Sequence, residues 1–182
     1  MSEISERFRT LAAAFTDRVE AVPGDRWESP SPCEGWTARD VVRHMIGNVD
    51  LFFGFVDEQR PSGASVDDDP AAAWAEARDA MQAALDDPDL GGREYDGFFG
   101  RTTLAQSVDR FLGVDLVVHS WDLARATGGD EKLDPDAVHE VFEALQPMDE
   151  QLRAPQAFGP KLEPPAGADE QTRLLAFLGR RA

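Results

Sequence analysis

The chain has 182 residues, of which 42% are hydrophobic, and this length is enough for one domain with a sizeable core. Its 35 Asp and Glu outnumber its 18 Lys and Arg, so the formal net charge is −17 at pH 7. A surface this acidic repels phosphate backbones and anionic lipid headgroups, and we therefore expect neither a nucleic-acid partner nor a membrane partner.

The first part of the chain predicts three helices. Apolar side chains recur at three- and four-residue steps over residues 3–22, until a Pro-Gly pair stops the pattern. After the loop WESPSPCEGW, Thr37 suits the N-cap of a second helix over 38–59, and Asp40 three residues later makes this close to a capping box. The polar loop PSGASVDDDP then closes on Pro70, which suits the first residue of a third helix.

The rest of the chain predicts further helices. Glycine and aspartate break the periodicity over 86–101, where we expect a long loop or a short hairpin, and a fourth long helix should cover 102–127 and stop at a Gly-Gly pair. A helix from Asp134 or Pro135, a proline-rich strap QAFGPKLEPPAGA and a closing helix in ADEQTRLLAFLGRR complete the pattern. The chain therefore predicts an all-α protein, a single domain over 1–182 built as a four-helix bundle with a C-terminal helical extension.

Two of the predicted helices carry polar side chains on otherwise apolar faces. In FLGVDLVVHSWDLARATG, Asp115 and His119 lie four residues apart, so they project side by side toward the interior. In TARDVVRHMIGN, His44 takes a similar position, and Asn48 follows it by one turn. Burying a carboxylate and two imidazoles is costly unless something pairs with them, and a divalent metal is one such partner.

Two His and one carboxylate suit a zinc ion with an open coordination position, and they equally suit nickel, iron or manganese. The residues also leave a simpler reading open, in which the imidazoles are satisfied within the core and Asp115 and His119 form an intrahelical ion pair. Asp122 falls on the same face and is placed to orient a ligand imidazole, or else to pair with Arg125. His139, in the acidic stretch DPDAVHE, indicates a solvated surface residue.

Other side chains are weaker candidates for a site. Trp36, Phe52 and Trp121 are pocket candidates, although aromatic residues at these positions are as readily explained as core. Arg125 is placed either to neutralise an anionic substrate or to form a surface pair. Cys33, the one cysteine, excludes an internal disulfide, and its loop position favours a structural or incidental thiol over a catalytic one.

The compartment follows from what the sequence lacks. The start MSEISERFRT carries no apolar run of the signal-peptide kind, and no segment approaches the ~20 apolar residues of a membrane span. We therefore expect a cytoplasmic protein.

The segments WESPSPCEGWTARDVVRHMIGN and VDLVVHSWDLARATG, with the ending FGPKLEPPAGADEQTRLLAFLGRR, resemble the DinB-like superfamily. Within it the chain is similar to an actinobacterial group related to the N-terminal domain of mycothiol-dependent maleylpyruvate isomerase, and the resemblance covers nearly the whole chain. It implies a four-helix bundle holding a divalent metal, usually zinc, through one His and an acid-x-x-x-His pair. The matching residues here are His44, Asp115 and His119.

Two departures from the isomerase pattern limit which properties of the isomerase can be inferred for this chain. The isomerase has Glu at the acid position, whereas this chain has the shorter Asp115, so the metal is expected to sit differently or bind more weakly. We also expect no counterpart of the additional C-terminal domain of the full isomerase. Isomerase activity itself is therefore not inferred from the resemblance.

The resemblance implies a divalent-metal-binding enzyme that activates a low-molecular-weight thiol, mycothiol, for S-transfer or isomerisation of a small electrophilic substrate. Asn48, Asp122 and Arg125 are the residues expected to support its chemistry, and no catalytic residue is assigned. Two alternatives stay open, a metal-dependent hydrolase that uses water as the nucleophile and a non-catalytic metal- or ligand-binding bundle. A homodimer through an exposed helix face also stays open.

Overall fold

The structure is a computed structural model that describes residues 2–97, 99–153 and 160–182. The chain divides into two compact units, residues 1–130 and residues 131–182, and each is described by itself. Among the described residues the secondary structure is helical apart from one two-stranded hairpin and an isolated bridge, which confirms the all-α prediction.

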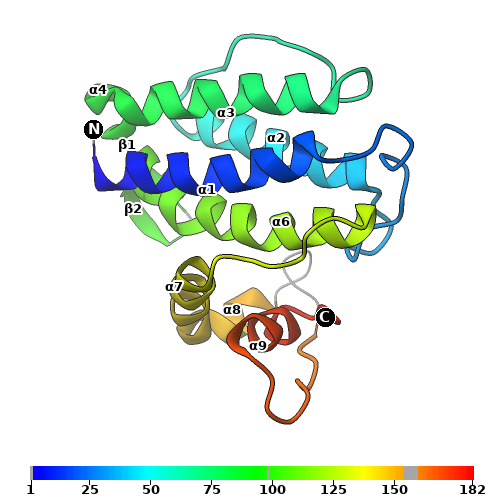
Figure 1. The fold of residues 1–182 in the computed structure, drawn as a ribbon. Helices are drawn as coiled ribbons and strands as arrows, with labels where there is room; N and C mark the ends of the chain where they lie inside the picture. Colours follow the sequence, from blue (N-terminus) through cyan, green and yellow to red (C-terminus); the bar gives the residue numbers. More distant parts are fainter. Residues whose placement is uncertain (1, 98, 154–159) are drawn as a thin grey trace. The chain divides into compact units, whose positions relative to one another are not determined.

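The first unit is a four-helix bundle, which also confirms the predicted architecture (Figure 1). Its long helices are α1 (Glu3–Glu20), α2 (Ala38–Phe55), α3 (Pro70–Asp86) and α6 (Gly113–Thr127). Helix α1 packs against α3 and α6, and α2 packs against the same two helices from the other side. Each long helix therefore has two neighbours, and their apolar stripes meet in one core.

Aromatic packing and a polar pair fix the relation of α1 to α3. The ring of Phe15 meets the buried indole of Trp74 edge-on, with 4.9 Å between centroids. The indole Nε1–H donates to the hydroxyl of Thr16 at 2.9 Å, and that hydroxyl donates to the carbonyl of Ala12 at 2.7 Å. The buried indole is thus satisfied without water, as a polar atom in a core must be.

The helix boundaries mostly agree with the sequence pattern, and one differs clearly. The predicted second helix over 38–59 is too long, because α2 ends at Phe55. Asp57 takes a left-handed conformation with φ of +57°, and the Glu58 N–H donates to the carbonyl of Phe53 at 3.0 Å. This is a Schellman ending, in which Asp57 does what glycine usually does, and composition alone does not reveal it.

The segment after α3 resolves the loop-or-hairpin alternative in favour of a hairpin. A short helix α4 (Pro88–Gly91) leads into strand β1 (Glu94–Gly97), which pairs antiparallel with β2 (Gly100–Thr103). The hydroxyl of Tyr95 donates to Ser107 Oγ at 2.6 Å. This bond joins the hairpin to the start of the following helical segment.

The fourth helix was predicted as one run over 102–127, and the structure corrects this. It begins as α5 (Leu104–Ser107), widens into a π-helical turn η1 (Val108–Leu112) and continues as α6. The N–H of Gly113 donates to the carbonyl of Val108, five residues earlier. A π turn holds one residue more than an α turn, so no heptad-like apolar spacing marks it in the sequence.

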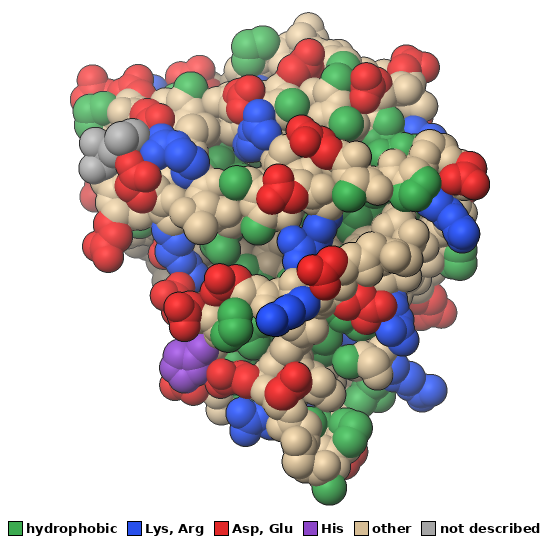
Figure 2. Space-filling view, in the orientation of Figure 1, with side chains coloured by type: hydrophobic (Ala, Val, Ile, Leu, Met, Phe, Trp, Pro, Cys, Tyr) green, Lys and Arg blue, Asp and Glu red, His purple; other side chains and the backbone are tan. Residues whose placement is uncertain are grey.

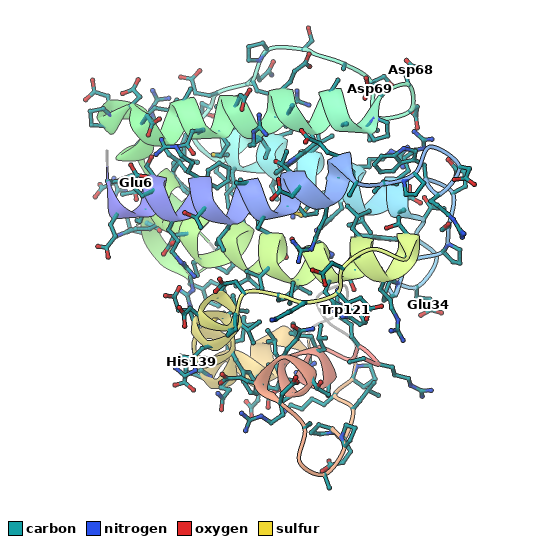
Figure 3. The ribbon with its side chains drawn as sticks, in the orientation of Figure 1. Glu6, Glu34, Asp68, Asp69, Trp121 and His139 are labelled. Carbon is teal, nitrogen blue, oxygen red and sulfur yellow. The ribbon has the colours of Figure 1, made fainter. Side chains whose placement is uncertain are left out.

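The second unit consists of α7 (Pro135–Leu145), η2 (Gln146–Met148), α8 (Asp149–Leu152) and α9 (Glu170–Phe177). Helices α7 and α9 pack together, with the rings of Phe142 and Phe177 5.7 Å apart. The two expected helices are confirmed, and His139 lies exposed on α7 (Figure 3). The beginning of the predicted strap, residues 156–159, lies outside the described residues, and 160–168 carry turns but no helix or strand.

The surface matches the composition. Acidic side chains are spread over the face seen in Figure 2, with Lys and Arg between them. Within the described ranges, no helix combines the length and the apolar character that crossing a bilayer requires.

Candidate metal centre

The loop before α2 brings two side chains, Cys33 and Trp36, into contact with residues of α2 and α6. A tight turn closes with the Trp36 N–H donating to the carbonyl of Cys33 at 3.0 Å, and Gly35 within it has φ of +77°. The Ser31 N–H donates to the carbonyl of Trp36 at 2.8 Å. Glycine is required at position 35 because side chains seldom tolerate that conformation. The turn thereby fixes both Cys33 and Trp36.

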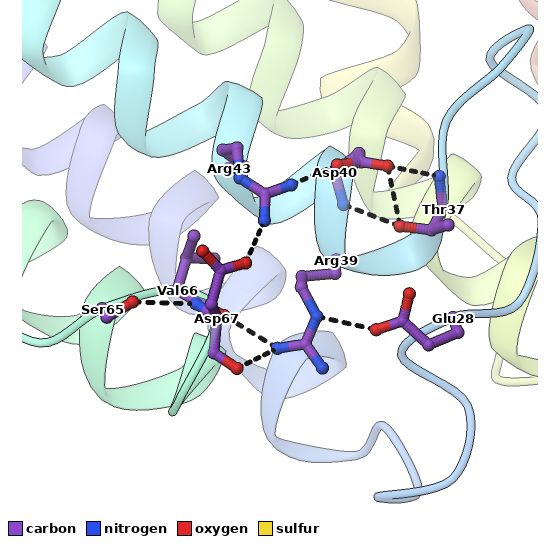
Figure 4. A network of polar contacts seen from close by, with 8 residues as sticks. All are labelled: Glu28, Thr37, Arg39, Asp40, Arg43, Ser65, Val66 and Asp67. Atoms are coloured by element: carbon purple, nitrogen blue, oxygen red, sulfur yellow. Dashed lines mark hydrogen bonds and ion pairs between the residues drawn. The ribbon is translucent and has the colours of Figure 1, made fainter.

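The start of α2 is anchored by a complete capping box, confirming Thr37 as the N-cap. The Asp40 N–H donates to Thr37 Oγ1 at 3.2 Å, and the Thr37 N–H donates to Asp40 Oδ2 at 2.9 Å (Figure 4). Bonds to the Asp40 carboxylate from the Thr37 N–H and from the Thr37 hydroxyl, with the nearby Arg43 and Arg39, hold the pKa of Asp40 below its ordinary value of 3.8. The helix that carries His44 therefore starts at a defined residue.

Arginines tie two loops to this helix start. Arg39 donates to the carboxylate of Glu28 at 2.9 Å and to the carbonyls of Val66 and Asp67 at 2.8 and 2.9 Å (Figure 4). Arg43 pairs with Asp40 on its own helix and with Asp67. The loops on both sides of α2 are thus attached to its first two turns.

The three predicted ligands come together between α2 and α6. His44 Nε2 lies 3.7 Å from Asp115 Oδ2, and His119 Nε2 lies 4.0 Å from Asp115 Oδ1. One donor atom from each residue lies within 4.8 Å of the others. His119 is buried, whereas His44 and Asp115 are partly exposed, so the cluster opens on one side.

The donor set fits a divalent metal. Two bonds of about 2.1 Å at a tetrahedral angle place their donor atoms about 3.4 Å apart, slightly less than the two distances here. The shorter Asp115 carboxylate still reaches both imidazoles, since each carboxylate oxygen faces a different ring. Three protein ligands with one open side is the arrangement of catalytic zinc sites.

Asn48 joins two of the three ligands. Its Nδ2 lies 2.7 Å from Asp115 Oδ2 and 3.0 Å from His44 Nε2. Nε2 has one in-plane lone pair, so a metal bound there would take the place of this contact, and the amide would keep its bond to the Asp115 carboxylate. The Asn48 amide therefore lies between the imidazole of His44 and the carboxylate of Asp115 and contacts both.

Behind the cluster, a buried carboxylate contacts His119. Asp122 is fully buried, and its Oδ2 lies 2.9 Å from His119 Nδ1. With the proton on Nδ1, the Nε2 lone pair is directed toward Asp115. The thiol of Cys33 donates to the same Oδ2 at 3.5 Å, so Cys33, His119 and Asp122 make a second, overlapping group of metal-ligating types.

The remaining candidates separate into those near the cluster and those away from it. The ring of Trp36 lies 4.9 Å from that of His44 and 6.1 Å from that of His119, centroid to centroid. Phe52 lines a cavity that also contacts Asn48. Arg125, in the last turn of α6, lies over the ring of Trp121 one turn earlier, at 5.7 Å; Figure 3 labels Trp121. Neither Trp121 nor Arg125 lines that cavity.

Sequence reasoning missed two features of this region. The contact of Cys33 with Asp122 depends on a tertiary approach of a loop to α6, 89 residues away in sequence, and no local spacing signals it. The aromatic wall that the hairpin and the π turn contribute to the neighbouring cavity has no periodic signature in the sequence. Each depends on a contact with a helix distant in sequence, α6 for Cys33 and α2 for the cavity wall.

The chain is similar to one described protein family and to two mycobacterial proteins. Residues 8–124 match the family model described as the mycothiol maleylpyruvate isomerase N-terminal domain. Two uncharacterized proteins of Mycobacterium tuberculosis, from strains CDC 1551 / Oshkosh and ATCC 25618 / H37Rv, are each 31% identical to it over 179 residues, covering 92% of both chains. No solved structure matches the chain significantly.

The matched segment contains His44, Asp115 and His119, all of α2 and α3, and α1 and α6 apart from residues 3–7 and 125–127. A family model that covers this much of the chain, together with relatives aligned over nearly their whole length, agrees with the DinB-like bundle described above. The chain therefore belongs to the mycothiol maleylpyruvate isomerase N-terminal domain family.

Proposed function

We propose that this protein binds a divalent metal, zinc first among the candidates, through His44, Asp115 and His119 and uses it to activate a low-molecular-weight thiol. Family membership supports mycothiol as that thiol. The observation that carries the proposal is the convergence of two imidazole nitrogens on the two oxygens of one carboxylate, at 3.7 and 4.0 Å. The proposal includes the cytoplasmic location expected from the sequence.

When bound, zinc would supply a cationic centre that lowers the pKa of a coordinated thiol, so that thiolate exists near neutral pH. The chain's own residues keep the donors in place for it. Asp122 holds the proton of His119 on Nδ1, and Asn48 restrains the carboxylate of Asp115. The indole of Trp36 covers the imidazoles from the loop side, which limits water there.

A thiolate generated here has two balanced outcomes with an electrophilic substrate. It displaces a leaving group, forming a carbon–sulfur bond as the leaving group departs with its electron pair. Alternatively it adds to a conjugated double bond, the resulting single bond rotates, and loss of the thiolate restores the double bond in the other geometry. Both need the thiol, which separates the proposal from a hydrolase that uses water.

The first experiment measures metal content by mass spectrometry on protein purified without a histidine tag and then reconstituted with zinc. We expect about one zinc per chain, the stoichiometry of a site with a single set of three ligands. His119→Ala should lose the metal. His139→Ala is the matched control, because His139 is exposed on α7 and bonds Glu170 at 3.0 Å.

Metal retained in His119→Ala, or absent from the native protein after reconstitution with zinc and nickel, would refute the metal site. A second assay then adds mycothiol to the loaded protein with a small unsaturated or halogenated electrophile. Turnover that needs both metal and thiol supports the proposal. Turnover with metal and water alone indicates a hydrolase, and metal binding without turnover indicates a non-catalytic bundle.

A further inference from the structure

A cavity of about 460 Å³ begins at the candidate ligand cluster. It is lined by α2 on one side and by the hairpin, α5 and η1 on the other. Asn48 and Asp115 form one end of its lining. Phe52 and Phe55 lie one and two turns beyond Asn48 on α2, and Phe111 lies one turn before Asp115, on η1. From Asn48 to Phe55 is about 10 Å along the helix axis, enough for a small molecule that reaches the cluster with one end.

The walls of this cavity are aromatic rings. Phe55 stacks on Tyr95 at 5.2 Å, and Phe99 stacks on Phe111 at 5.9 Å, so the hairpin contributes two of these rings, and α2 and the π turn contribute one each. Among the described residues, the large apolar side chains that are exposed are Leu51, Phe55 and Phe99, at 52%, 41% and 48% of their surface. All three line this cavity. Apolar surface gathered in this way marks a binding site.

The charged residues that line the cavity are mainly basic, whereas the protein as a whole is acidic. In a chain with 35 acidic and 18 basic residues, its charged lining is Asp115 at the cluster end and Arg101 and Arg110 away from it. Arg101 bonds the carboxylates of Glu94 and Asp96. The Arg110 guanidinium lies over the rings of Phe99 and Phe111, 4.8 and 5.4 Å from their centroids. Guanidinium groups stacked on aromatic faces are well suited to bind carboxylates.

The shape of the cavity is formed before any ligand arrives. The Tyr95 hydroxyl bonds Ser107, and Thr102 Oγ1 lies 3.4 Å from the same Ser107 Oγ. The Leu104 N–H donates to the carbonyl of Arg93 at 3.1 Å. These bonds fix the hairpin against α5, and the π turn that carries Arg110 and Phe111 follows directly. π turns inside helices occur frequently at functional sites.

We propose that this cavity binds the body of an aromatic, anionic compound, with its ring between the Phe55–Tyr95 and Phe99–Phe111 pairs and its carboxylate at Arg110. The assignment of this compound as the electrophilic substrate rests on the proposed function, because its other end then points to Asn48 and Asp115. Binding to the cavity itself needs no metal.

The test uses the metal-free full chain and isothermal titration calorimetry with three probes, 2-naphthoate, its neutral amide 2-naphthamide, and the non-aromatic cyclohexanecarboxylate. We expect saturable binding of 2-naphthoate and binding about tenfold weaker for each of the other two, which corresponds to the loss of one charged contact or one set of ring contacts. Equal binding of all three probes would overturn the assignment, as would no saturable binding of 2-naphthoate.

Two variants locate the binding. Phe55→Ala should weaken 2-naphthoate about tenfold, and Arg110→Met, which keeps an apolar side chain over the rings, should bring 2-naphthoate to the affinity of 2-naphthamide. The matched controls are Arg60→Met, whose guanidinium bonds Asp50 at 2.6 Å, and Phe142→Ala on α7. Neither control lines the cavity, and neither should change the affinity. Equal loss in controls and test variants would place the probe elsewhere and overturn the proposal.

The two proposals fail separately. Absence of metal uptake, with 2-naphthoate binding that depends on Phe55 and Arg110, removes the thiol-activating function and leaves the aromatic-anion site in place. Metal uptake without 2-naphthoate binding removes the aromatic-anion site and leaves the metal centre.

Discussion

The carboxylate of Asp122 lies against His119 Nδ1 at 2.9 Å and is completely buried between that imidazole and the thiol of Cys33. A buried carboxylate in this position fixes both the tautomer and the orientation of the ring in front of it. This contact at Nδ1 leaves Nε2 of His119 directed toward Asp115.

Asp122→Asn should weaken zinc binding about tenfold, at the lower end of the range for partners of ligand imidazoles, because the amide keeps a hydrogen-bond acceptor but removes the negative charge. The measurement is the zinc dissociation constant by competition with a fluorescent chelator. Asp109→Asn is the control, because Asp109 pairs with Arg7 at 2.7 Å away from the cluster. An affinity unchanged in Asp122→Asn would contradict the role assigned to this carboxylate.

Asp115→Glu should retain one zinc per chain, because the longer side chain restores the acid found in the isomerase pattern. Asp115→Asn should weaken zinc more than Asp122→Asn does, by over about 100-fold, because it removes a charged ligand and not merely its partner. The same competition assay measures both. If Asp115→Asn bound zinc as the native protein does, the carboxylate would not be a ligand.

Thr16→Val should destabilise the first unit by about 1–3 kcal/mol, because it leaves the buried Trp74 N–H without its acceptor. The free energy of unfolding from urea denaturation checks this. Thr10→Val is a close control, since the Thr10 hydroxyl bonds the Glu6 carbonyl at an exposed position and its loss should change stability by less than about 0.5 kcal/mol. Similar losses in both variants would show that the indole bond does not matter.

Thr37→Ala should cost about 1 kcal/mol of stability, because it removes the hydroxyl that caps α2. The same change should raise the pKa of Asp40 part of the way toward 3.8, since it leaves the first cause of the lowering, the bond from the Thr37 backbone N–H, and removes the second, the bond from the Thr37 hydroxyl. A lowered carboxyl pKa adds stability above pH 3.8 that disappears as the pH falls through the folded-state value. The acid unfolding midpoint of the variant should therefore shift upward, and an unchanged midpoint would contradict this role of the capping box.

In the second unit, the bond from His139 to Glu170 raises the pKa of the imidazole above 6.5. Glu170→Gln should bring that pKa back toward 6.5, which proton NMR of the His139 ring measures directly. Because the folded-state pKa is the higher one, the pair contributes fully below pH 6.5 and its contribution is lost as the pH rises through the folded-state value. A pKa unchanged in Glu170→Gln would rule out this pair as the cause.

Much of the fold could be predicted from local signals. The stripe of α1, the capping box at Thr37, the Pro70 start of α3 and the glycine at the end of α6 all depend on neighbouring residues, and the structure contains each of them. The end of α2 could not be predicted, because an aspartate rather than a glycine takes the left-handed position there.

Two members of the candidate cluster could be predicted to face the same side because they lie in one regular helix. Asp115 and His119 both lie in α6, after the π turn, so the regular spacing of about 100° per residue holds between them. The aromatic cavity wall gives no such signal, because Tyr95 and Phe99 lie in the hairpin, where helix spacing does not apply, and Phe111 lies in the π turn, where it does not hold. Contacts such as Cys33 with Asp122 need the folded loop, which no local pattern contains.

The π turn η1 sets the rotation of α5, next to the hairpin, relative to α6, which carries Asp115 and His119. Deleting one residue within Val108–Leu112 would convert the turn to ordinary α-helix and rotate α5 by about 100° relative to α6. Asp115 and His119 would keep their spacing, while Ser107 and the hairpin bonded to it would face another direction. The spacing of the candidate ligands on α6 and the lining of the cavity can therefore change independently of each other, through a single-residue change in the length of the π turn.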